Sequence, residues 1–138
     1  MVKRPKYVDV NVFIYWLTSH PEFGKKAKMW IKRMERGGEY ITSSLTLYEV
    51  AIIISGLVNK SLRDREFLEK TLTPLLEIQN LRIEPLLKQD FVNALSIAKK
   101  YKLDLEDSLH LSVAIRTGCE SIISNDKDFD KTELKRIF

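Results

Sequence analysis

Four acidic residues of this 138-residue chain stand among apolar neighbours, away from the charged runs: Asp9, Glu49, Asp107 and Asp126. Asp9 and Asp126 each follow a short β-prone run, so their carboxylates meet beyond one sheet edge if those strands are parallel neighbours. The other two acids are expected to approach from flanking helices. Converging carboxylates repel one another, and hard divalent cations such as Mg²⁺ or Mn²⁺ relieve that repulsion. Two such ions can activate a water and stabilise the leaving oxygen in phosphodiester hydrolysis.

Each acid also has an ordinary structural role available to it. Asp9 can cap the helix that follows, and Glu49 can sit on the wet side of its helix. Asp107 can complement a helix dipole, and Asp126 can form a turn. Spacing alone leaves both interpretations open.

The elements that must position these acids alternate between strand and helix patterns, which predicts an α/β fold with a mostly parallel sheet covered on both faces. Turn and cap residues set the expected bounds, and no linker or repeat interrupts the chain. Strands are expected at 7–10, 39–42, 81–84 and 121–124, with a short edge strand at 136–138. Helices are expected at 12–17, 21–36, 45–58, 88–101 and 104–118, with one more from a Ser61 and Asp64 capping box to a break near Pro74.

Two helices carry apolar patterns that predict packing. The run Val50 to Ile54 is apolar on every side, which indicates either central core or an oligomer interface. In the helix at 88–101, the residues Phe91, Leu95 and Ala98 recur at helical spacing and are expected to be buried.

Composition bounds the class of protein. With 44% hydrophobic residues, the chain is expected to form a single domain over residues 1–138. The net charge of +4 fits a polyanionic partner without requiring one. One cysteine, Cys119, permits no internal disulfide and no cysteine metal site, and no run is long enough to span a membrane. A cytoplasmic protein is expected.

Four short motifs in order carry a family resemblance. They are Asp9-Val10-Asn11, Ser44-Leu45-Thr46-Leu47-Tyr48-Glu49-Val50, Asp107-Ser108-Leu109-His110-Leu111 and Ser124-Asn125-Asp126-Lys127-Asp128-Phe129. Together they resemble a PIN domain, and in size the chain is similar to stand-alone VapC-type toxins of VapBC toxin–antitoxin pairs. Many relatives carry Thr at the position of Ser124 and Ala at that of Ser108.

The resemblance implies a three-layer α/β/α fold around a sheet of four to five strands, and an Mg²⁺- or Mn²⁺-dependent endoribonuclease. Asp9, Glu49, Asp107 and Asp126 would then be the metal ligands and catalytic acids, with Asn11 and Ser124 supporting them by hydrogen bonds. It further implies a homodimer and a small antitoxin partner. Asp128 would be the weaker acid, in a turn where Phe129 packs inward.

Single-stranded RNA is the expected substrate, because a metal pocket needs an exposed phosphodiester and basic surroundings. Lys25, Lys28, Lys32 and Arg36 share one helix face and Lys127 stands nearer the acids, although such a row is also typical of a solvated face. Tyr15 and Trp16 could stack on bases or pack internally. His110, one turn after Asp107, is interpreted as a packing or hydrogen-bonded residue.

Two other protein classes that place an Asp after a strand match this sequence less well. A haloacid-dehalogenase phosphatase needs a second Asp where this chain has Asn11, and a receiver domain needs an Asp after the third strand, which ends in Glu84-Pro85. The remaining alternative is a catalytically silent PIN-fold module that binds RNA or protein. It would have no need of four intact acids.

Overall fold

The computed structural model describes residues 3–138 as a five-stranded sheet in which every adjacent pair of strands is parallel. The strand order is β3-β2-β1-β4-β5, so the first strand of the chain lies at the centre. The fold is the expected three-layer α/β/α arrangement. The strands are β1 (Lys6–Val8), β2 (Tyr40–Ser43), β3 (Leu81–Glu84), β4 (Ser121–Ile123) and β5 (Lys135–Ile137).

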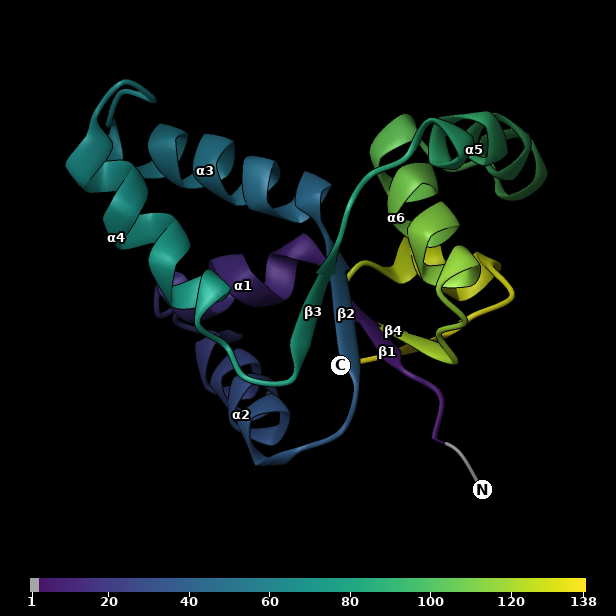
Figure 1. Cartoon of the computed structure of the whole chain (residues 1–138), viewed down its shortest axis with the longest axis horizontal. Coiled ribbons are helices and arrows are strands. Elements are labelled where there is room, and N and C mark those ends of the chain that lie inside the picture. Colours follow the sequence, from purple (N-terminus) through teal and green to yellow (C-terminus); the bar gives the residue numbers. More distant parts are fainter. Residues whose placement is uncertain (1–2) are drawn as a thin grey trace.

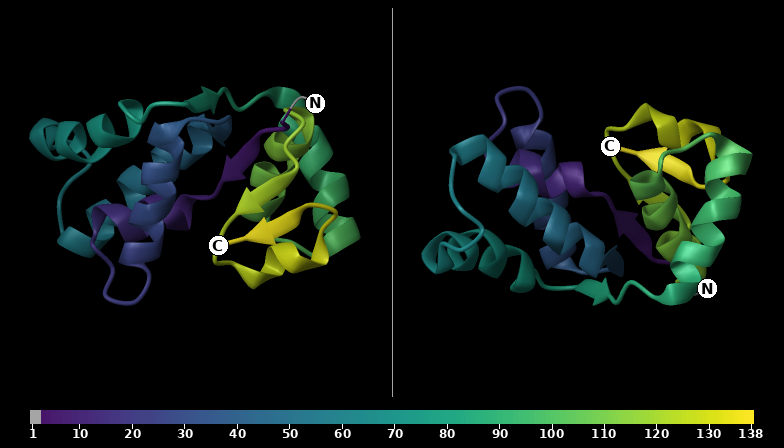
Figure 2. Two further views of the ribbon diagram at one scale, coloured as in Figure 1. Left: turned by 90° about the horizontal axis from the view of Figure 1, so that it is seen from below. Right: turned by 90° about the horizontal axis from the view of Figure 1, so that it is seen from above.

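Helices cover both faces of this sheet (Figures 1 and 2). The first four helices pack on one face and the last two on the other, and the latter side also carries a short 3-10 helix, η1 (Lys127–Lys131). The helices are α1 (Val10–Leu17), α2 (Gly24–Arg36), α3 (Ser44–Val58), α4 (Arg65–Leu76), α5 (Lys88–Tyr101) and α6 (Leu105–Arg116).

Strand alternation divides the core into two clusters. In β1, Tyr7 packs against the α5 and α6 side while Val8 packs against the α1 to α4 side. In β4, Ile122 and Ile123 divide in the same way. All four side chains are fully buried, so the two-residue period of the central strands builds both cores at once.

Several boundaries differ from the prediction. The strand expected at 7–10 ends at Val8, and the helix expected from residue 12 begins at Val10, because the Asp9 carboxylate accepts from the Val10 N–H and caps α1. Pro21 was expected to open the second helix, but α2 begins at Gly24, because the ring Nδ1 of His20 accepts from the backbone N–H groups of Glu22 and Phe23 at 3.1 Å and holds a turn there. Ser61 was expected to cap α4, but the Asp64 carboxylate accepts from the N–H of Phe67 and caps it instead. Ser61 only supports the preceding turn, through the N–H of Arg63. Helix α4 ends at Leu76, two residues after Pro74.

The predicted core face of α5 is wrong. Phe91 is 45% exposed and Leu95 71% exposed, and Ala98 is only partly buried. The residues of α5 that are buried are Asp90 and Ala94. Asp90 takes the inward position because Arg116 of α6 neutralises it, with Nε 2.8 Å and Nη2 3.0 Å from its carboxylate oxygens. The apolar stripe is thereby turned to solvent.

The carboxyl ends of β1 and β4 lie side by side, as the placement of Asp9 and Asp126 requires. Helix α1 leaves this edge and packs between α2 and α3. Among residues 3–138, no helix is long and apolar enough to cross a membrane.

Candidate active site

Asp9 lies at the junction of β1 and α1 and is 3% exposed. One carboxylate oxygen accepts from the N–H of Val10 at 2.8 Å, which makes Asp9 the cap of α1. The other accepts from the Ser124 hydroxyl at 2.6 Å and from the Asn11 amide at 3.4 Å. Burial raises the pKa of Asp9, although His110, Ser124 and the Val10 N–H each oppose that rise.

Asn11 and Ser124 connect the ends of β1 and β4. The Asn11 amide donates to the Ser124 hydroxyl oxygen at 3.1 Å, and the same oxygen accepts from the N–H of Asp126 at 3.0 Å. The Asn125 N–H lies 3.4 Å from the Asn11 side-chain oxygen. These hydrogen bonds hold the start of α1 after Asp9 and the turn at Asp126 in one arrangement.

A second group of acids is formed by Asp107, Asp126 and Asp128, each of which offers a carboxylate oxygen within 4.8 Å of the others. Asp107 lies in the first turn of α6, while Asp126 caps η1 by accepting from the N–H of Asp128 at 2.9 Å. Burial, followed by the charges of Asp126, Asp104 and Asp9, raises the pKa of Asp107 to about 8. Asp107 is therefore protonated near neutral pH when no cation shares the site.

Glu49 reaches the site through His110. Its carboxylate lies 2.5 Å from Nε2 of His110, and the same nitrogen lies 3.9 Å from Asp9. Both Glu49 and His110 are buried. Burial alone would lower the pKa of His110, yet Tyr7, Glu49 and Asp9 together raise it well above its ordinary value. The imidazolium thus joins two of the predicted acids.

The Tyr7 hydroxyl completes this connection. It lies 2.7 Å from Nδ1 of His110 and donates to the hydroxyl of Ser43 at 3.1 Å. The interpretation of His110 as a hydrogen-bonded residue holds, but the link it makes between Glu49 and Asp9 could not be read from spacing. The available signal was a histidine one turn after Asp107, between Leu109 and Leu111.

Glu106 is a further acid that sequence reasoning did not select. A hydrogen bond with Glu49, then burial and the charges of Glu49 and Asp104, raise the pKa of Glu106 to about 7. When two carboxyl groups lie close together, one of them keeps a proton and hydrogen-bonds to the other, which raises its pKa. The signal in the sequence was its place directly before Asp107.

This donor set fits a hard divalent cation. The cluster offers only carboxylate oxygens, the ligands that Mg²⁺ and Mn²⁺ prefer. Besides burial, the charges of Asp126, Asp104 and Asp9 raise the pKa of Asp107, and a bound cation would relieve that repulsion. Asp128, the acid expected to matter least, lies within the cluster, while Phe129 is fully buried as predicted.

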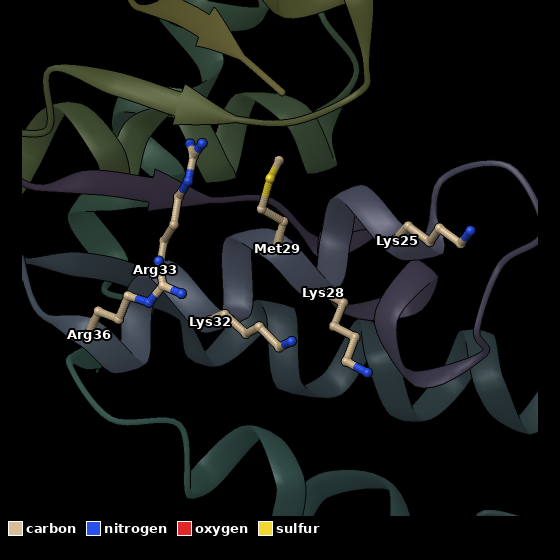
Figure 3. Close-up of a pocket in the computed structure, with 6 residues that line it drawn as sticks. All are labelled: Lys25, Lys28, Met29, Lys32, Arg33 and Arg36. Carbon is tan, nitrogen blue, oxygen red and sulfur yellow. The ribbon is translucent and has the colours of Figure 1, made fainter.

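The predicted basic residues fall into two places. Lys25, Lys28, Lys32 and Arg36 line one pocket on α2 together with Met29 and Arg33 (Figure 3). This pocket shares no residue with the acidic site. Lys127 lies instead on η1, between Asp126 and Asp128 in sequence and exposed.

A family model for the PIN domain matches residues 6–135, so the chain belongs to the PIN domain family. No curated protein sequence matches the chain closely enough to count as a relative. Solved structures that resemble it include a toxin and a toxin–antitoxin complex. VapBC2 from Rickettsia felis, bound to a DNA fragment from its promoter, is 16% identical with a TM-score of 0.72, and the match covers 96% of this chain and 97% of that one.

Two further structures show the same fold. The sarcin–ricin loop cleaving toxin VapC20 from Mycobacterium tuberculosis is 14% identical with a TM-score of 0.73, covering 94% of this chain and 95% of that one. A toxin–antitoxin complex from Klebsiella pneumoniae is 19% identical with a TM-score of 0.65, covering 96% of each chain. At these identities the likeness establishes a VapC-type PIN fold.

Proposed function

We propose that this protein is a divalent-metal-dependent endoribonuclease that cleaves single-stranded RNA, and that it is the toxin of a VapBC-type pair. The observation that carries the proposal is the carboxylate cluster of Asp107, Asp126 and Asp128 beside the buried Asp9 and Glu49. Membership of the PIN family and the likeness to a toxin described as cleaving the sarcin–ricin loop support the same reaction class.

Asp107, Asp126 and Asp128 would hold Mg²⁺ or Mn²⁺ directly, while Asp9 and Glu49, which lie outside this group of three, would add negative charge beside it. When bound, the metal supplies a polarised water and stabilises the charge on the leaving oxygen. Ser124 and Asn11 fix the Asp9 carboxylate, and His110 balances the negative charge of Glu49. Lys127, exposed beside these acids, attracts the phosphate.

The partners follow from the fold and from exposed apolar side chains. The solved relatives include toxin–antitoxin complexes, which supports a small antitoxin that covers the acidic site of this chain. A homodimer would bury large apolar side chains of α3 and α5 that are exposed and have no partner among the described residues. They are Ile52, Ile53, Leu57, Phe91, Val92 and Leu95.

Cleavage of a short labelled single-stranded RNA tests the reaction, in Mg²⁺, in Mn²⁺ and in EDTA. We expect cleavage only with metal, and a loss of about 100-fold or more in an Asp9→Asn protein whose fold is matched by circular dichroism. Asp130→Asn is the control, because Asp130 pairs with Arg136 outside the cluster. Absence of both cleavage and calorimetric metal binding would instead favour a catalytically silent binding module.

A further inference from the structure

The positive charge of this protein is concentrated on one helix. Helix α2 holds six of the 23 Lys and Arg residues and one of the 19 acids, so α2 carries a net charge of +5 while the rest of the chain is −1. The whole basic excess of the molecule therefore lies on a single element. A solvated helix face has no need of such segregation, and a polyanion would be attracted to it.

These cations are not neutralised within the protein. Among residues 3–138, none of the six lies within ion-pair distance of a carboxylate, whereas the other basic residues supply every ion pair of the structure. Two of the six are fixed against aromatic rings: Arg33 lies 4.7 Å from the Trp30 ring centre and Lys26 lies 5.1 Å from that of Phe138. Lys25, Lys28, Lys32 and Arg36 are left exposed.

The exposed cations border two adjoining pockets. One, of about 380 Å³, is lined by α2 residues alone (Figure 3). The other, of about 370 Å³, shares Lys25 and Lys28 with it and continues past Gly24 to Trp16 and His20. Together the two pockets form one groove, which is lined by Lys and Arg along α2 and ends beside the rings of Trp16 and His20. In proteins that bind single-stranded nucleic acid, basic side chains contact the phosphates and an aromatic ring stacks on a neighbouring base.

The groove lies away from the acidic site but within reach of the same strand. Helix α1 has Asp9 at its amino end and Trp16 near its carboxyl end. Its eight residues span about 12 Å, which roughly four stacked nucleotides would cover. An RNA whose cleaved bond lies at the acids can therefore reach the groove within a few nucleotides.

We infer that the groove formed by α2 and the α1–α2 turn is a second RNA-binding site, which holds the backbone of single-stranded RNA a few nucleotides from the bond that is cleaved. The inference rests on the proposed ribonuclease function for its choice of RNA. RNA fits the site better than an acidic protein segment does, because evenly spaced phosphates match a row of Lys and Arg, and a base matches Trp16.

Binding is measured in EDTA, so the test does not depend on catalysis. The probe is a fluorescein-labelled single-stranded RNA of about 20 nucleotides, followed by anisotropy at several salt concentrations. Lys28→Gln with Lys32→Gln should weaken binding by about tenfold near 0.1 M salt and reduce the salt slope by about 1.4, the value for two lost phosphate contacts. The matched control is Lys60→Gln with Lys99→Gln, both exposed and outside the groove.

The position of the strand is checked with tryptophan emission. In a Trp30→Phe protein, Trp16 is the remaining indole, and we expect its emission to fall when RNA binds. Equal affinity and equal slope for the two double variants, or unchanged Trp16 emission on binding, would overturn the inference. Competition by poly-glutamate that is as strong as that by RNA would overturn it too, in favour of an acidic protein partner. Cleavage that fails in the catalytic assay while α2-dependent binding persists would refute only the ribonuclease.

Discussion

At the scale of single residues, His110 decides how two of the acids share a buried space. Its raised pKa makes the ring a cation that donates to Glu49 from Nε2 and to the Tyr7 oxygen from Nδ1. Unpaired, a buried carboxylate is very costly, so the imidazolium makes the position of Glu49 tolerable. The residue identities suggested the acids, but only the structure could reveal that side chains from α3, α6 and β1 meet at His110.

Replacing His110 by Phe should therefore destabilise the protein strongly. The change leaves Glu49 and the Tyr7 hydroxyl without their buried partner, and we expect the free energy of unfolding to fall by about 3 kcal/mol. Urea unfolding measures it. Tyr7→Phe, which removes one hydroxyl, should cost only about 1 kcal/mol. If both variants lose the same amount, the ion pair contributes little.

The acid cluster makes stability depend on pH. Because the pKa of Asp107 is about 8 in the folded protein and about 3.9 in an unfolded chain, the folded state keeps a proton that the unfolded state releases between those values. Stability in EDTA should thus decline from about pH 4 to about pH 8. The melting temperature of wild type should drop over this range, and less so for Asp126→Asn, which removes one repelling charge.

Divalent metal supplies the complementary measurement. Mg²⁺ should raise the melting temperature of wild type more at pH 8 than at pH 6, because the proton on Asp107 competes less with the metal as pH rises. Asp130→Asn should respond as wild type does. A melting temperature that is independent of both pH and Mg²⁺ would contradict the proposed metal site.

At the scale of elements, the order of strands and helices was easier to predict than the face that a helix buries. The bounds of β3 and α5 agree with the prediction, because Asn80, Pro85 and the helix-forming run between 88 and 101 mark them locally. The face that α5 buries depends instead on Arg116, a residue of another helix. Apolar spacing cannot show that an ion pair will occupy the inward position.

The Asp90–Arg116 pair should fasten α5 to α6. Burial alone would raise the pKa of Asp90, but hydrogen bonds from Arg116 and from the N–H of Leu87 lower it below its ordinary value. Its contribution to stability is therefore present above about pH 4 and lost as pH falls further. We expect Asp90→Asn to cost about 3 kcal/mol in urea unfolding near neutral pH, and less in mild acid. If Asp90→Asn lowers the free energy of unfolding equally at neutral and at acidic pH, the effect comes from packing and not from the ion pair.

At the scale of the whole molecule, charge and apolar surface lie on different elements. Basic residues gather on α2, acids at the carboxyl edge of the sheet, and exposed apolar side chains on α3 and α5. The order of motifs sufficed to predict the fold and the meeting of Asp9 with the turn at Asp126. It could not predict that α5 would leave Phe91 and Leu95 in solvent, and so join α3 as a candidate interface.

Light scattering at micromolar concentration tests that interface. We expect a dimer for wild type and a monomer for Leu95→Arg or Ile53→Arg, because a charge in a desolvated contact is left unpaired. Leu76→Arg on α4 places the same charge on an exposed apolar residue outside α3 and α5 and should remain dimeric. A monomeric wild type would contradict the proposal.

The central position of β1 has a consequence for biosynthesis. Asp9 emerges early from the ribosome, whereas Ser124, its hydrogen-bond partner, follows 115 residues later. Strand β1 therefore cannot pair with β4 until most of the chain has been made. A nascent chain lacking β4 cannot bring Asp9 and Asp126 together. The carboxylate cluster of Asp107, Asp126 and Asp128 therefore cannot form until translation has passed Asp128.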